Sequence, residues 1–370
     1  MSGTIITADI AIVGAGMAGA SLAAEIGDAA RIVLIEAEAQ PGYHSTGRSA
    51  AFWQESYGGP AVQPLTTASR AYLADHALLS DRGAVYLAGA DGAAAIDRLV
   101  RDFGGAVRLD RLAAAQVAAL IPGLRPGHGG GLSEPSCRDI DVAGLHAHYL
   151  GRAKRAGALL REDARVVAVE RADGCWHVAT TAGAVVAPVI VNAAGAWASE
   201  IAAMAGAQAI TITPYRRTMI QLQVDPPVSP TMPLVMDATE SFYFKPEVGQ
   251  FLASPADETP SPPCDAQPEE MDIAIAVERI ETATTLEIRR IKNKWAGLRS
   301  FVADKNLVVG YDPVVEGLFW LAGQGGYGIQ TGESAGRLAA SLALGKGMPA
   351  DIAGLGVSAA ALSPARFTQR

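Results

Sequence analysis

The hydrophobic and polar positions near the N-terminus predict a strand, a loop, a helix and a second strand. Residues 8–13 are largely apolar, residues 14–19 are rich in glycine, residues 18–26 are rich in alanine, and residues 31–35 are apolar again. This order is typical of the first unit of a nucleotide-binding sheet. We therefore expect an α/β fold that begins with a Rossmann-like unit.

The same kind of pattern predicts further elements along the chain. Asp141 is expected to cap a helix at 142–156, with Gly157 at its end. A second helix is expected near 111–120, and the Pro-, Asp- and Ser-rich stretch 255–268 is expected to be a surface loop. The remaining apolar runs predict strands at 166–169, 176–180, 189–192, 211–224, 241–244 and 317–322.

The C-terminal part has the same pattern as the opening unit. The strand at 317–322 is followed by the glycine-rich segment 323–328 and by a helix expected at 329–344. The chain is therefore expected to return to its first domain, which makes both domains discontinuous. We expect the first domain to contain residues 1–80, 136–206 and 300–370, and a second, α+β domain with a mixed or antiparallel sheet to contain residues 81–135 and 207–299.

Composition narrows the possible functions. With 370 residues, 49% hydrophobic and 18% charged, the chain can bury the cores of two domains. A net charge of −8 argues against nucleic acid as a partner. The three cysteines lie far apart without a C-x-x-C pair, which argues against a zinc site and favours a reducing, cytoplasmic setting. No unbroken apolar run is long enough to predict a transmembrane segment.

The glycine loop is the strongest single motif. Residues 14–19 read G-x-G-x-x-G between a predicted strand and a predicted helix. Gly14 permits the tight turn, Gly16 lets the backbone approach a pyrophosphate, and Gly19 lets helix and strand pack closely. Glu36 follows the second strand, where a carboxylate can accept hydrogen bonds from ribose hydroxyls and would repel a 2′-phosphate. A dinucleotide other than NADP is therefore expected.

Two further loops favour FAD over NAD. Residues 42–51 are dense in small and hydroxyl side chains that can lie against a pyrophosphate and a flat ring, with Arg48 available for charge. Residues 323–328 open a helix whose N-terminus would stabilise an anionic reduced flavin. Glycine-lined surfaces at both ends of the chain suit a cofactor as long as FAD.

Five stretches of sequence together form a specific pattern, although no single one of them would. They are 40–51 (QPGYHSTGRSAA), 191–197 (VNAAGAW), 241–246 (SFYFKP), 295–304 (WAGLRSFVAD) and 324–331 (QGGYGIQT). These stretches resemble the D-amino-acid oxidase/glycine oxidase family of flavoproteins, and within it most closely the D-arginine dehydrogenases. The resemblance implies a two-domain fold with non-covalently bound FAD and a substrate held over the flavin by a mixed sheet.

The resemblance also implies roles for single residues. Arg217 and Arg299 match the pair that receives the substrate carboxylate, although Arg216 is adjacent and only one of the two neighbours can face a site from a strand. Tyr243 matches a phenol that supports this carboxylate, Tyr57 one on a loop over the site, and Gly326 the backbone acceptor for the amine. The expected cofactor contacts are Gly14, Gly16, Ala18, Gly19, Glu36, His44, Ser45, Thr46, Arg48, Ser49, Ala50, Ala51, Val166, Ala194, Gly195, Trp197, Arg299, Gly325, Gly326, Tyr327, Gly328, Ile329 and Gln330.

The chain departs from the D-arginine dehydrogenase pattern where the substrate side chain is expected. Phe52 stands in place of a histidine, and Ala84 stands in place of a glutamate suited to a guanidinium. An unpaired guanidinium in a partly apolar pocket is unfavourable. A neutral or apolar side chain is therefore expected to be preferred over arginine, unless Asp81 or Glu55 compensates.

These observations predict an FAD-dependent D-amino-acid dehydrogenase. Hydride transfer from Cα to flavin N5 would give an imino acid that hydrolyses to a 2-oxo acid and ammonia, with the electron acceptor left open. The alternative is a sarcosine-, proline- or hydroxyproline-type oxidase or dehydrogenase of secondary amines. A hydrolase is disfavoured, because Ser334 in the G-x-S-x-G match at 332–336 falls inside a predicted helix. A metal site is not expected, since His146 and His148 face different sides of a helix.

Overall fold

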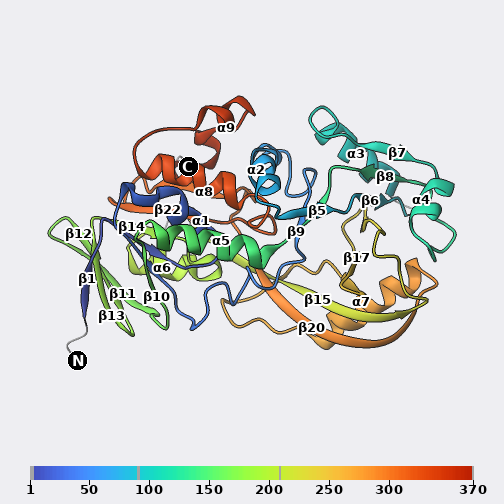
Figure 1. Cartoon of the computed structure of the whole chain (residues 1–370), viewed down its shortest axis with the longest axis horizontal. Coiled ribbons are helices and arrows are strands. Elements are labelled where there is room, and N and C mark those ends of the chain that lie inside the picture. Colours follow the sequence, from blue (N-terminus) through green and yellow to red (C-terminus); the bar gives the residue numbers. More distant parts are fainter. Residues whose placement is uncertain (1–3, 90–91, 208–209, 369–370) are drawn as a thin grey trace.

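The computed structural model describes residues 4–89, 92–207 and 210–368. Two large sheets lie at opposite ends of the long axis of the molecule (Figure 1). Segments from the beginning, the middle and the end of the chain, coloured blue, green and red, share one end. This arrangement brings the two glycine-rich loops, at 14–19 and 323–328, into the same half of the molecule.

A six-stranded sheet forms the first end. Neighbouring strands are parallel throughout, except for the last pair. The order is β10 (Leu159–Arg161), β3 (Ile32–Ile35), β2 (Ile10–Val13), β14 (Val189–Asn192), β22 (Leu318–Ala322) and β21 (Val308–Tyr311). The predicted α/β class is confirmed, with helix α1 (Met17–Ile26) between β2 and β3.

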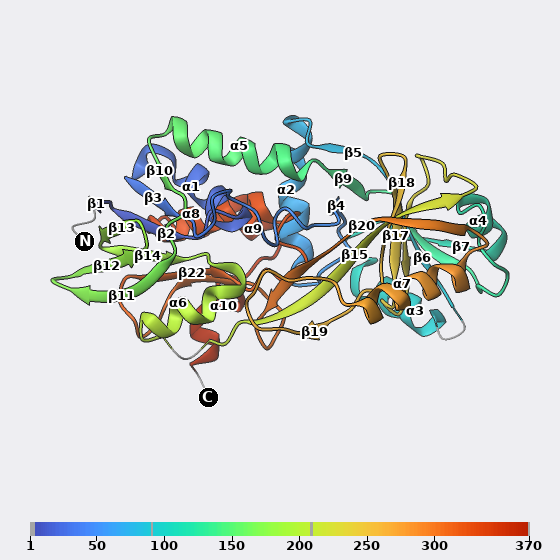
Figure 2. The ribbon, with the colours of Figure 1, turned by 90° about the horizontal axis from the view of Figure 1, so that it is seen from below.

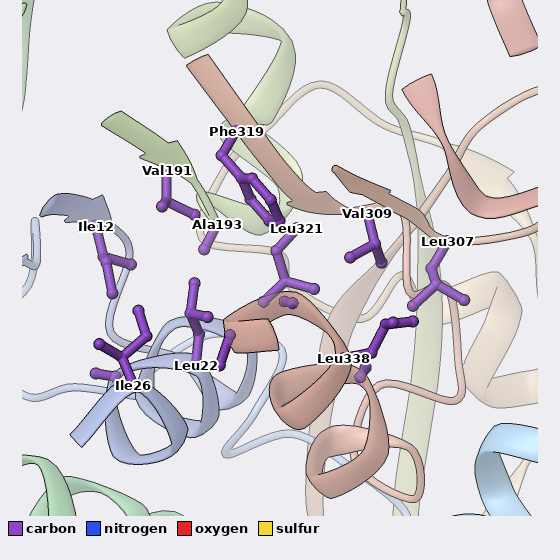
Figure 3. Packing of buried hydrophobic residues seen from close by; sticks show 14 of the residues in the cluster. Ile12, Leu22, Ile26, Val191, Ala193, Leu307, Val309, Phe319, Leu321 and Leu338 are labelled. Atoms are coloured by element: carbon purple, nitrogen blue, oxygen red, sulfur yellow. The ribbon is translucent and has the colours of Figure 1, made fainter. Parts of the chain in front are cut away.

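Alternate residues of the buried strands pack on opposite faces of this sheet. Ile10 and Ile12 of β2 belong to the cluster that includes residues of α1 and α8 (Gly332–Ala343), and Figure 3 shows Ile12 beside Leu22 of α1. Ala11 and Val13 pack on the other face with α6 (Ala198–Met204) and a smaller sheet. The smaller sheet contains β1 (Ile5–Thr7), β13 (Gly183–Ala187), β12 (Cys175–Thr180) and β11 (Val166–Ala172), and α5 (Val142–Arg155) packs beside α1.

A nine-stranded mixed sheet forms the other end. Its longest strands are paired antiparallel over their whole length and extend toward the first sheet (Figure 2). The strands are β19 (Thr259–Pro260), β15 (Thr213–Asp225), β18 (Gln250–Ser254), β17 (Tyr243–Glu247), β16 (Leu234–Asp237), β6 (Ala84–Leu87), β8 (Gly131–Glu134) and β7 (Asp110–Leu112), with β20 (Glu287–Phe301) along β15.

A small three-stranded sheet and further helices complete the fold. The sheet contains β4 (Phe52–Trp53), β9 (Arg138–Ile140) and β5 (Leu79–Asp81). The remaining α-helices are α2 (Gln63–Asp75), α3 (Gly92–Phe103), α4 (Ala114–Leu120), α7 (Glu270–Ala283), α9 (Ala350–Gly354) and α10 (Ala359–Leu362). None of the helices within the described ranges combines the length and the apolar character needed to cross a membrane.

The helix predictions are right where a capping signal is present. Asp141 caps α5, and its Oδ1 accepts a hydrogen bond of 2.8 Å from the Gly144 amide. The helix expected at 329–344 begins only at Gly332, because the preceding residues form a turn in which the Thr331 hydroxyl donates to the Tyr327 carbonyl. The helix expected at 111–120 begins at Ala114, since Leu112 pairs with β8 in the second sheet.

The strand predictions miss one long element. The first eight residues of β20 are mostly exposed and carry Arg and Lys, so no apolar run marks them. The predicted hairpin is confirmed as β11 and β12, and the stretch 255–268 is a loop apart from the two residues of β19. The domain bounds stay a prediction.

Candidate active site

One large cavity runs from the glycine loop of β2–α1 to the β15–β20 ribbon. It encloses about 1740 Å³ when the part open to solvent is counted. Most of the expected cofactor residues line it, namely Gly14, Gly16, Ala18, Glu36, His44, Ser45, Thr46, Arg48, Ser49, Ala50, Ala51, Val166, Ala194, Gly195, Trp197, Arg299, Gly325, Gly326, Gly328, Ile329 and Gln330. A cavity lined by both glycine-rich loops suits a long cofactor.

Two expected cofactor residues lie outside the cavity wall. A Cβ on Gly19 would lie 1.9 Å from the Gly14 carbonyl oxygen, so Gly19 serves the close packing of helix and loop. Tyr327 is buried, and its hydroxyl donates to the carbonyls of Lys305 and Gly323 instead of facing the cavity. Both residues support the loops that line the cavity without lining it themselves.

Side chains from other elements hold the glycine loop in place. Glu36 accepts a hydrogen bond from the Ala15 amide at 3.0 Å, and the Thr46 hydroxyl accepts one from the Met17 amide at 3.0 Å. On the opposite side His146 of α5 donates from Nε2 to the Ala15 carbonyl at 2.8 Å. Burial lowers the pKa of His146, although this hydrogen bond and the nearby Glu36 oppose the shift. The sequence pattern carries no signal for this contact of His146.

The loop at 42–51 contacts both the cavity and β20. The Ser45 hydroxyl donates to the Leu298 carbonyl at 2.7 Å. The Arg48 guanidinium donates to the Ala296 carbonyl at 3.1 Å and forms an ion pair with Asp265, so it anchors the loop. The His44 ring packs at a tilt against Trp197, with 4.6 Å between the ring centres, and its Nδ1 is buried without a hydrogen-bond partner among the described residues.

Arg217 and Arg216 lie on different sides of β15, although both are close to Asp257. Arg217 lines the cavity, where Nε donates to the Asp257 carbonyl at 2.8 Å and one terminal nitrogen lies 3.3 Å from a Glu258 oxygen. Arg216 points to the other side of β15 and pairs with Glu269 and with Asp272 at 2.9 Å. Alternation along β15 therefore gives the cavity Arg217.

Arg299 of β20 is the cation at the centre of the cavity wall. Its guanidinium lies 3.5 Å from the Tyr243 hydroxyl and 5.7 Å from the centre of the Tyr57 ring. Burial opposes the charge, but Tyr57, Tyr243 and the nearby carboxylates of Glu258 and Asp257 together raise the pKa of Arg299 above its usual value. Among the described residues no carboxylate forms an ion pair with it, so the geometry favours an anionic ligand.

The C-terminal glycine loop approaches the same place. A Cβ on Gly326 would lie 2.2 Å from the Tyr57 hydroxyl and 3.0 Å from the Arg299 guanidinium carbon, so only glycine fits here. Burial raises the pKa of Tyr57, which keeps the phenol protonated at neutral pH. The structure thus brings together Arg217, Arg299, Tyr243, Tyr57 and Gly326, although Tyr57 itself is not part of the cavity wall.

The two residues expected to set specificity are in different positions. Phe52 lines the cavity, with its ring 5.4 Å from Tyr57 and 6.2 Å from Tyr243. Ala84 is buried within the second sheet and does not reach the cavity wall. Met219 lines the cavity beside Tyr243 instead, and the sequence analysis missed it because a methionine in a strand looks like ordinary core.

Comparison with known proteins decides the family. A family model for FAD-dependent oxidoreductases, named DAO, matches residues 9–342. The chain belongs to the DAO family. Its cofactor is FAD, and the predicted family resemblance is confirmed at this level.

Solved structures share the fold of this DAO-family chain. Glycine oxidase from Geobacillus kaustophilus has a TM-score of 0.81 at 22% identity, with 93% of this chain and 96% of that chain covered. L-Proline dehydrogenase from P. horikoshii has a TM-score of 0.86 at 20% identity, with 99% of both chains covered.

Curated relatives match over a part of their length. FAD-dependent oxidoreductase domain-containing protein 1 from Xenopus laevis is 27% identical over 42% of this chain and 34% of its own length. Human mitochondrial dimethylglycine dehydrogenase is 31% identical over 34% of this chain and 15% of its own length.

The residues around the cavity fit FAD. The N-terminus of α1 and the close-packed glycine loop would hold the pyrophosphate, and Glu36 retains lone pairs for ribose hydroxyls. The unpartnered His44 Nδ1 offers a polar atom to the cofactor. Gly195 has a φ of +55° and no atom within 4 Å of a Cβ, so its backbone leaves room along the wall.

Proposed function

We propose that this chain is an FAD-dependent D-amino-acid dehydrogenase that prefers neutral or apolar side chains over arginine. The observation that carries the proposal is the Arg299 guanidinium, which lines the cavity beside two phenols without an ion-pair partner among the described residues. A carboxylate is the ligand that a guanidinium binds best. The broader proposal, an oxidoreductase of amino acids or amines, rests on the same observation.

Each part of such a substrate would have a binding partner in the cavity. Arg299 and Arg217 would bind the carboxylate, Tyr243 and Tyr57 would orient it, and the Gly326 carbonyl would accept a hydrogen bond from the amine. FAD held in this cavity would supply the oxidation, with the hydride leaving Cα, and hydrolysis of the resulting imino acid would give a 2-oxo acid and ammonia. Two anchors on one substrate fix the direction of its Cα–H bond.

We call Arg299 and Arg217, the pair proposed to bind the carboxylate, the clamp. The cavity wall beside the clamp supports a substrate with a neutral side chain. Phe52 and Met219 line the cavity near Tyr243, and neither offers a negative charge to a guanidinium. A particular kinship with the D-arginine dehydrogenases, the cytoplasmic setting and the non-covalent attachment of FAD stay predictions.

A secondary-amine substrate is the second candidate. Relatives and fold neighbours include dimethylglycine dehydrogenase, L-proline dehydrogenase and an iminodiacetate oxidase from Chelativorans sp. BNC1. Each of these names denotes an amino acid whose nitrogen is bonded to at least two carbon atoms and is separated from a carboxylate by one carbon. The same clamp would bind the acid, and the space around the nitrogen would decide between the classes.

A substrate panel tests the proposal. Purified protein whose visible spectrum has been recorded is assayed with D- and L-amino acids, sarcosine and L-proline, with a dye or oxygen as electron acceptor. We expect turnover of apolar D-amino acids with the dye, and a lower kcat/KM for D-arginine. Turnover of secondary amines alone would favour the second candidate, and no turnover of any D-amino acid would contradict the proposal.

A further inference from the structure

Glu134 is a buried carboxylate outside the cavity wall. It ends β8 in the second sheet, and none of its surface is exposed. It lies under the segment 54–57, which follows β4 and carries Tyr57 to the Arg299 guanidinium.

The carboxylate of Glu134 gathers donors from this segment. Its Oε1 accepts hydrogen bonds from the amides of Glu55 at 2.8 Å and Ser56 at 3.4 Å. Its Oε2 accepts from the Gln54 side chain at 3.1 Å and from the Ser56 hydroxyl. The Tyr86 hydroxyl lies 2.7 Å from the Ser56 hydroxyl and 3.0 Å from Gln54 Nε2, which extends the network.

The charge of Glu134 has no cationic partner. Within the described ranges no Lys, Arg or His forms an ion pair with it, and burial raises its pKa despite the neutral donors. A buried carboxylate of this kind is unfavourable unless several hydrogen bonds satisfy it. In contrast, the buried carboxylate of Glu333 in α8 pairs with Arg337 at 2.8 Å. The Glu134 carboxylate therefore depends on the hydrogen bonds from residues 54–56, and these residues depend on Glu134 as the acceptor for their donors.

Gln330, which lines the cavity, holds both ends of the same segment. Gln330 accepts a hydrogen bond from the Gln54 amide at 3.2 Å and donates one to the Tyr57 carbonyl at 3.0 Å. The segment is thus held between Gln330 at the cavity and Glu134 in the second sheet. The position of the Tyr57 ring beside Arg299 and Gly326 depends on both.

We propose that Glu134 is a positioning residue that holds segment 54–57 through its amide and hydroxyl donors and so fixes Tyr57 over the substrate-carboxylate site. The proposal rests on the proposed function for the identity of the ligand. The position of the segment itself is a property of this chain and is measured separately.

Hydrogen–deuterium exchange of the FAD-loaded protein tests the positioning without turnover. In Glu134→Gln the new amide group presents its own donors to Gln54 and Ser56, which leaves buried donors unpaired. We expect the amides of 54–57 to exchange about tenfold faster or more. The matched control Glu333→Gln removes a comparably buried carboxylate outside the cavity and is expected to leave exchange at 54–57 unchanged.

Kinetics of the same variants test the link to the ligand. Glu134→Gln is expected to raise KM for the best amino acid about tenfold, with a smaller change in kcat, and Glu134→Asp is expected to restore part of the loss. A wild-type protein that turns over no amino acid would contradict the proposed function, while the exchange data would still decide the role of Glu134.

Two results would overturn the proposal. One is exchange at 54–57 in Glu134→Gln that equals that of the wild type, and the other is a uniform increase over the whole chain. If Glu134→Gln does not fold, Ser56→Ala removes a single donor and is expected to give a smaller, local increase. Unchanged exchange in Ser56→Ala would then overturn it.

Discussion

At the scale of residues, the neighbours Arg216 and Arg217 provide a matched pair that tests which side chain binds the ligand. Arg217→Ala removes a cation from the cavity wall, whereas Arg216→Ala removes one that pairs with Asp272 outside it. We expect Arg217→Ala to lower kcat/KM about a hundredfold, mainly through KM, because removing one partner of a desolvated charge pair costs about 2–5 kcal/mol. Steady-state kinetics should show a much smaller change for Arg216→Ala, because Arg216 does not line the cavity. Equal effects of the two substitutions would argue against the clamp.

His146 predicts how stability depends on pH. Burial lowers its pKa in the folded protein below the usual value of 6.5, so the unfolded chain takes up the proton first as pH falls. Stability from the neutral ring is complete above pH 6.5 and is lost as pH falls from there toward the lower folded-state pKa. His146→Gln keeps a donor for the Ala15 carbonyl but does not titrate. Thermal melts at pH 7.5 and 5.5 should therefore show a smaller decrease in Tm for His146→Gln, and equal decreases would contradict this.

At the scale of elements, the packing of α1 on the glycine loop sets the shape of the cofactor site. In Gly19→Ala the new Cβ would lie 1.9 Å from a backbone oxygen that cannot move alone, so helix and loop must separate. We expect the purified variant to contain less than about half of the wild-type FAD per chain, as read from its absorption spectrum. Gly354→Ala in α9 meets no atom within 4 Å and should keep full FAD content.

Elements whose cues are local were predicted from the sequence. The β2–α1–β3 unit and α5 follow from apolar runs, a glycine loop and the Asp141 cap, all within a few residues of the element itself. The missed strand β20 lacks such cues, because much of it is exposed and only its pairing with β15 keeps it extended.

At the scale of the whole molecule, FAD should hold the two ends of the chain together. The cavity is lined by residues from 13–52 and from 297–330, so a bound cofactor stabilises contacts between distant segments. Free FAD at about 100 times its Kd contributes about 2.7 kcal/mol to stability. Apoprotein melted with FAD should show a Tm a few degrees higher than apoprotein alone, and NAD should give no such shift. The same Tm with FAD and without it would argue against this arrangement.

The sequence by itself determined the Rossmann-like class and the dinucleotide loop. These two follow from the period of the apolar positions and from glycine at turns, which act over short stretches of chain. The resemblance to a known family supplied most of the residues that line the cavity. The tertiary structure decided that Arg217 and not Arg216 faces the cavity, that Ala84 lies behind it, and that His146 reaches the Ala15 carbonyl 131 residues away. Such contacts exist only after the sheets have paired, so no local pattern of residues encodes them.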